Sequence, residues 1–196
     1  MDRTHLAAGA VALGFAMSPA FGGITPTSGD APAAPAAETI VLGSGGVHAI
    51  DVSGVLSSRN QGDALNTVFE LDVPELAVVV GFGWDLTVEI DSPGVLSDAM
   101  IGLVDGAGDG VVGNPGEGVN FPGTLGFATM PQVVALGDDA FMPGDGLYLE
   151  FYQQFSGPEA EYLTESTVYV ELVIIPAPAG SAVLAGAGLL AMRRRR

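Results

Sequence analysis

The sequence predicts an all-β domain, an antiparallel β-sandwich with jelly-roll or Greek-key connections, flanked by an N-terminal signal helix and a C-terminal hydrophobic helix. Short runs of residues alternate apolar and polar side chains, as strands with one buried face do. Turn-forming residues separate these runs and are abundant, with 29 Gly and 13 Pro. No segment between 38 and 175 repeats apolar residues with the 3.6-residue period of a helix. Because the strands follow one another closely, we expect antiparallel pairing, since a parallel crossover needs about a dozen residues.

The N-terminal segment has the pattern of an export signal. Arg3 precedes an apolar run, and small residues come before a cut after Ala20, which predicts a secretory signal peptide over 1–20. Residues 21–37 are small, polar and rich in Pro, and they predict a flexible linker. The folded domain is therefore expected over 38–175.

The alternation within this domain predicts about nine strands. The clearest is "WDLTVEID", where Trp84 and Leu86 face one way and Asp85 the other. In "GLYLEFYQ", Leu149 belongs to the apolar phase and Glu150 to the polar phase. The expected strands cover 38–42, 47–56, 65–73, 77–82, 84–91, 98–104, 132–136, 146–153 and 166–175.

The charge distribution is strongly one-sided. The net charge is −17, and the six basic residues are Arg3, Arg59 and four arginines at 193–196. A body with more than twenty carboxylates and one arginine repels phosphate and anionic lipid, which excludes nucleic acid as a partner. Cations are the natural small partners, and the alternative is that the charge serves solubility alone.

Several kinds of catalytic site are excluded by composition. The chain has no cysteine, so it has neither disulfides nor thiolate nucleophiles. Once the signal peptide is removed, His48 is the only histidine, which excludes multi-histidine metal sites. No Gly-x-Ser-x-Gly elbow is present. Paired carboxylates stay open by residue type, but we expect a protein that is not an enzyme.

The loop "DGAGDGVVGNPGEG" gathers oxygen ligands among glycines, and it is the candidate for a cation site. Hard oxygen ligands on a flexible loop suit Ca²⁺, which takes six to eight of them. The match to a calcium-binding EF-hand loop is partial, and the alternative is a solvated hairpin loop. No other cofactor is predicted. The candidate metal ligands are Asp105, Asp109, Asn114 and Glu117.

Two tyrosines are candidates for stacking on sugars. Tyr148 and Tyr152 share the polar phase of their strand with Glu150, so they are expected on its solvent face. An exposed pair beside a concave sheet would favour a lectin-like role. An outer face dominated by Asp, Glu and Thr would favour a structural one.

The C-terminal segment has three parts in order. A Pro176-Ala177-Pro178 motif is followed by an apolar stretch over 179–192 and then by Arg193, Arg194, Arg195 and Arg196. Fourteen helical residues would span roughly 21 Å, short of the ~30 Å hydrocarbon core. The arginines would stay on the cytoplasmic side by the positive-inside rule, so the segment predicts a weak, temporary membrane contact.

This tail resembles a PEP-CTERM sorting signal, in which a Pro-Glu-Pro motif, a hydrophobic helix and an Arg cluster are recognised by an exosortase. Ala177 departs from the usual Glu of that motif. The resemblance implies that a membrane peptidase cuts near Pro178 and passes the protein to the cell surface or extracellular matrix of a bacterium. Residues 65–173 also look like the β-sandwich bodies found ahead of such tails. The alternative is a plain C-terminal anchor.

Two functions follow from these expectations. The first is a non-enzymatic, exported cell-surface or matrix protein, handled by the secretion translocon, signal peptidase and an exosortase-type peptidase, and sorted through residues 176–196. The second is a secreted carbohydrate-binding module, assisted by Ca²⁺, whose partner would be an extracellular polysaccharide.

Overall fold

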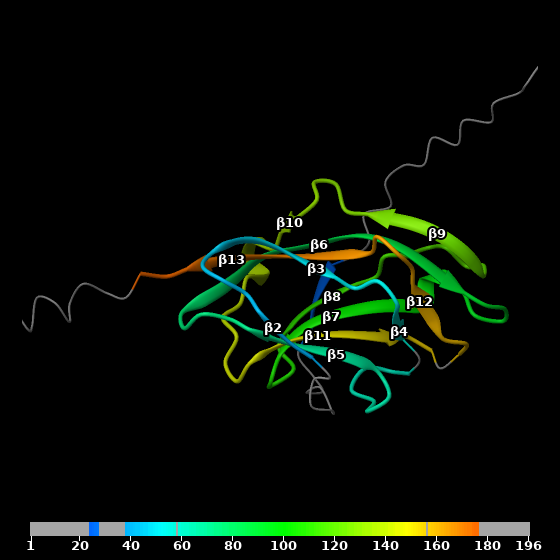
Figure 1. Ribbon diagram of the computed structural model, residues 1–196, viewed down its shortest axis with the longest axis horizontal. Helices are drawn as coiled ribbons and strands as arrows, with labels where there is room; N and C mark the ends of the chain where they lie inside the picture. The colour runs from blue at the N-terminus through cyan, green and yellow to red at the C-terminus, as the bar shows by residue number, and fades with distance from the viewer. Residues whose placement is uncertain (1–23, 28–37, 58, 156, 177–196) are drawn as a thin grey trace, which may run out of the picture.

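The computed structural model describes residues 24–27, 38–57, 59–155 and 157–176. Over these residues the chain is all-β, with two sheets packed face to face (Figure 1). The only helical pieces described are single 3₁₀ turns at Leu96–Asp98 and Gly137–Asp139. The predicted β-sandwich is therefore confirmed.

One sheet has six strands, and all of its neighbours pair antiparallel except β2 and β5, which are parallel. Its centre is β11, which pairs with β7 on one side and β5 on the other. In spatial order the strands are β1 (Ile24–Thr27), β8 (Gly110–Gly113), β7 (Ala99–Asp105), β11 (Leu147–Gln153), β5 (Thr67–Asp72) and β2 (Glu38–Val41).

The other sheet has seven strands organised around the long strand β6. One edge of β6 pairs with β13 and then β12, and its other edge pairs with β10 and β9. Strands β3 and β4 lie outside β13 and β12. The bounds are β3 (Gly46–Asp51), β4 (Val55–Ser57), β6 (Ala77–Ile90), β9 (Gly123–Ala128), β10 (Val134–Ala135), β12 (Ala160–Tyr162) and β13 (Thr167–Ile174).

The core lies between the two sheets and is rich in aromatic rings. Trp84 is 1% exposed and contacts Phe82 edge to face, with ring centroids 5.7 Å apart. Phe151 makes similar contacts with Phe69 at 6.1 Å and with Tyr162 at 4.8 Å. The apolar phase of the predicted 84–91 strand faces this core throughout, so the alternation there is confirmed.

Several element boundaries differ from the prediction. The folded part begins before Glu38. Residues Ile24–Thr27, which lie inside the expected linker, form β1 and pair with β8. The expected strands 77–82 and 84–91 are one continuous strand, because Gly81 and Gly83 both pair with β13, and the register with β13 shifts by one residue next to Gly81. Three further strands, β8, β9 and β12, lie in segments that carry no clear alternation.

The predicted signal peptide over 1–20 and both expected terminal helices lie outside the described residues, as do Ala177, Pro178 and the arginines at 193–196. Pro176 is described and exposed, just beyond the end of β13. Among the described residues, no helix has the length and apolar character needed to cross a bilayer.

Candidate functional site

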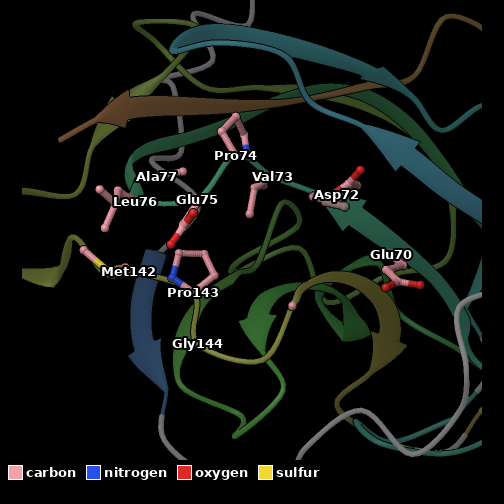
Figure 2. A pocket seen from close by; sticks show the side chains of 12 residues that line it. Glu70, Asp72, Val73, Pro74, Glu75, Leu76, Ala77, Met142, Pro143 and Gly144 are labelled. Carbon is pink, nitrogen blue, oxygen red and sulfur yellow. The ribbon is translucent and has the colours of Figure 1, made fainter. Parts of the chain in front are cut away.

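A groove of about 500 Å³ opens at the end of β5 (Figure 2). One side is the end of β5 and the turn that leads into β6. The other side is the loop that leads into β11. The described lining residues are Glu70, Leu71, Asp72, Val73, Pro74, Glu75, Leu76, Ala77, Met142, Pro143, Gly144 and Gly146.

Three carboxylates line this groove. Glu70 and Asp72 alternate along β5 with core residues, so both lie on the face of the sheet that points away from the core. Glu75 follows in the β5–β6 turn, and Figure 2 shows it between the Glu70–Asp72 end and Met142. None of the twelve described lining residues is basic, so the groove attracts cations.

The opposite end of the groove is apolar. Leu76 is 38% exposed and Met142 is 48% exposed, and Figure 2 shows them on the same side of the groove. Leu76 has a φ of 64°, in the left-handed region where a side chain with a Cβ costs about 1–2 kcal/mol. The Leu76 carbonyl accepts the N–H of Ile175 at 3.1 Å, which ties this strained residue to the end of β13.

The loop that forms the other wall is held from two directions. The backbone groups of Phe141 and Val79 exchange hydrogen bonds of 2.8 and 3.2 Å, which fix the start of the loop on β6. The N–H of Gly144 lies 3.5 Å from Oδ2 of Asp105. Gly106 permits the two loops to lie this close together, because a Cβ at position 106 would lie 2.5 Å from the carbonyl oxygen of Asp145.

The predicted cation loop is divided by β8: Asp105 and Asp109 lie at the turn between β7 and β8, whereas Asn114 and Glu117 follow β8. Asp105 is 7% exposed, and its Oδ1 accepts the N–H groups of Ala107 and Asp109 at 2.9 and 3.0 Å. Asn114 donates through Nδ2 to the carbonyl of Ser97, while Asp109 and Glu117 are exposed. Within the described ranges, no three acidic or histidine side chains are grouped to hold a metal ion. Asp105 therefore organises the turn and the neighbouring groove wall, and Ca²⁺ binding stays a prediction.

The two candidate stacking tyrosines have different surroundings. Tyr148 is half-buried and pairs in register with Glu70, and a Cβ on Gly146 would lie 3.0 Å from its hydroxyl oxygen. Tyr148 is therefore next to the groove. Tyr152 is only 7% exposed, packs beside Gly102, and burial raises the pKa of its hydroxyl. The expected exposure of Tyr152 is thus corrected.

Glu150 accounts for the burial of the outer face of β11, the face that also carries Tyr152. Its Oε1 accepts the N–H of Gly62 at 2.8 Å and Nδ2 of Asn66 at 2.7 Å, so the 59–66 loop folds over the strand. The residue is 1% exposed, and Oε2 has no hydrogen-bond partner in the described part of the chain. Burial raises the pKa of the Glu150 carboxyl, and the neighbouring charge of Asp63 adds to this effect.

The groove residues were not singled out from the sequence. The only local signal is "ELDVPEL", in which Glu70 and Asp72 lie in the polar phase of the predicted 65–73 strand and Glu75 follows it. Nothing in this stretch indicates that Met142, some 65 residues later, completes the site. The pairing of β11 with β5 brings the two segments together.

Comparison with known proteins gives no match, neither to a protein-family model, nor to a curated protein, nor to a solved structure.

Proposed function

We propose that this protein is a non-enzymatic, exported cell-surface or extracellular-matrix protein. Its terminal segments deliver it, and its β-sandwich body has a structural or adhesive role. The observation that carries the proposal is that the last described strand, β13, is fully paired within the body before the tail begins. Strand β13 pairs with β3 and β6 along its length, and Ile175 makes a further hydrogen bond to Leu76. A cut near Pro178 would therefore remove no described strand.

The strand connectivity supports a jelly-roll body. We class the sandwich as a jelly roll, because from β3 onward the chain passes repeatedly from one sheet to the other. In this scheme β3–β4, β12–β13, β6 and β9–β10 form one layer, and β5, β11, β7 and β8 form the other. Such double sheets are common in capsid and lectin domains.

The surface charge agrees with a role outside the cell. Arg59 is the only basic residue between 21 and 176. The excess of carboxylates would keep such a body soluble and apart from anionic lipid, even while the tail holds it near a membrane. Delivery would then depend on the two terminal segments and not on the charge of the body.

The carbohydrate-binding alternative now rests on Tyr148. Tyr152 is covered by its neighbours, so the two rings do not form a joint stacking surface. Tyr148 lies beside the groove and is the one ring of the pair with part of its surface accessible.

Replacing Arg193–Arg196 with serine should stop delivery to the surface, because the positive cluster that orients the tail is lost. Cell fractions and medium are probed for the protein, and we expect the variant to stay with the membrane or inside the cell. Arg59→Ser is the control, since Arg59 uses only backbone groups in its described hydrogen bonds and lies on the body. Equal surface delivery of the serine variant and the wild type would contradict the proposal.

A further inference from the structure

We propose that the groove at the β5–β6 turn binds a short basic peptide segment of a partner protein, with Lys or Arg side chains at Glu70 and Asp72 and an apolar side chain between Leu76 and Met142. This inference uses the groove alone and goes beyond delivery through the tail.

The charge of the groove is not neutralised from within the body. Its three carboxylates come from one short stretch of chain, and Arg59 lies at the other end of β11. The Arg59 carbonyl accepts the N–H of Gln153, whereas the groove lies at the Leu147 end of that strand. Six residues of strand separate these ends by roughly 20 Å. The body therefore supplies no lysine or arginine side chain to the groove, and a basic segment of a partner would complement its charge.

The apolar end distinguishes this groove from the rest of an acidic surface. Leu76 and Met142 leave more than a third of their surface exposed, and methionine adapts its shape to different partners. Leu76 is also held in a sparsely populated backbone conformation by Ile175. Strain of this kind persists where the surrounding structure maintains it, as at binding sites.

The dimensions and chemistry favour a peptide over other cationic ligands. A volume of about 500 Å³ accommodates a few side chains. None of the twelve described lining residues is aromatic, and Tyr148 lies beside the groove and not in its lining, so the lining itself offers a sugar no ring to stack against. Figure 2 shows Glu70 and Asp72 at one end and Leu76 and Met142 at the other, with Glu75 beside them, an arrangement that suits a segment with basic side chains next to an apolar one.

The test measures binding of a fluorescent peptide of alternating Lys and Leu to the full chain by anisotropy. Binding should weaken as salt rises from about 20 to about 300 mM, because salt screens exposed charges. The triple variant Glu70→Gln, Asp72→Asn, Glu75→Gln should bind roughly tenfold more weakly. The control makes the same charge change at three exposed carboxylates of the other sheet, with Asp85→Asn, Glu89→Gln and Glu161→Gln.

The apolar contact is tested separately. Met142→Ser should weaken binding of the Lys–Leu peptide but leave a Lys–Ser peptide unaffected. Circular dichroism checks that each variant keeps the wild-type fold. The proposal is overturned if the control triple loses as much affinity as the groove triple, if a Glu–Leu peptide binds equally well, or if a cationic glucosamine oligomer binds the groove more tightly than the peptide.

Discussion

Trp84→Ala is expected to lower the free energy of unfolding by about 3–5 kcal/mol. The indole is fully enclosed between the sheets, packs against Phe82, and stands over Gly113 of the facing sheet. Since ordinary domains are stable by about 5–15 kcal/mol, this loss is a large fraction of the whole stability. Urea unfolding followed by circular dichroism measures it, because the variant lacks the only tryptophan.

Gly113 provides the matched control for this contact. A Cβ there would lie 2.5 Å from Cζ3 of Trp84, so Gly113→Ala should destabilise the wild type by about 1–3 kcal/mol. In a Trp84→Phe background the atoms that clash are missing, and the same change should cost less. An equal cost in both backgrounds would show that Trp84 does not pack on Gly113.

Two substitutions of Glu150 should have opposite effects. Glu150→Ala removes the acceptor of Gly62 and Asn66, and buried donors without partners should cost about 2–4 kcal/mol in total. Glu150→Gln keeps an oxygen acceptor and removes a buried charge, so at alkaline pH it should be more stable than the wild type by on the order of 1 kcal/mol.

The advantage of Glu150→Gln should depend on pH. The pKa of Glu150 is raised in the folded state above its ordinary value of 4.5, so the fold favours the protonated form. Its contribution to stability is therefore fully present below the unfolded pKa and is lost as pH rises through the folded pKa. The glutamine variant should gain on the wild type over this range, in unfolding curves from about pH 4 to about pH 9. A difference independent of pH would contradict the burial of the charged carboxylate.

The sequence predicts the strands whose two faces differ. β6 is recognisable because Trp84, Leu86 and Val88 face the core while Asp85 and Glu89 are exposed. β11 is recognisable as a strand, but its outer face is misleading. Glu150 and Tyr152 look like solvent-facing residues, yet both are buried, and the 59–66 loop covers Glu150. Alternation of apolar and polar residues shows that one face of a strand is buried. A loop that covers the other face leaves no periodic pattern in the sequence of the strand.

Two of the strands missed from the sequence, β8 and β12, have only four and three residues, and they form because neighbouring strands pair with them. β8 is a run of four residues with glycine at both ends, and it forms because β7 and β1 pair with it. The groove depends in the same way on the pairing of β5 with β11, which joins residues far apart in the chain. The turn at Asp105, by contrast, is predictable, because an Asp among glycines favours a turn. The Asp105 carboxylate organises that turn by accepting two backbone N–H groups.

The central claim, that terminal segments deliver an intact β-sandwich, is tested most directly by the intact mass of the protein recovered from the cell surface or medium. We expect a mass that lacks the first twenty or so residues and the tail from about Pro178 onward. A surface protein whose mass still includes Arg193–Arg196 would contradict cleavage at the tail and reduce that segment to a plain anchor.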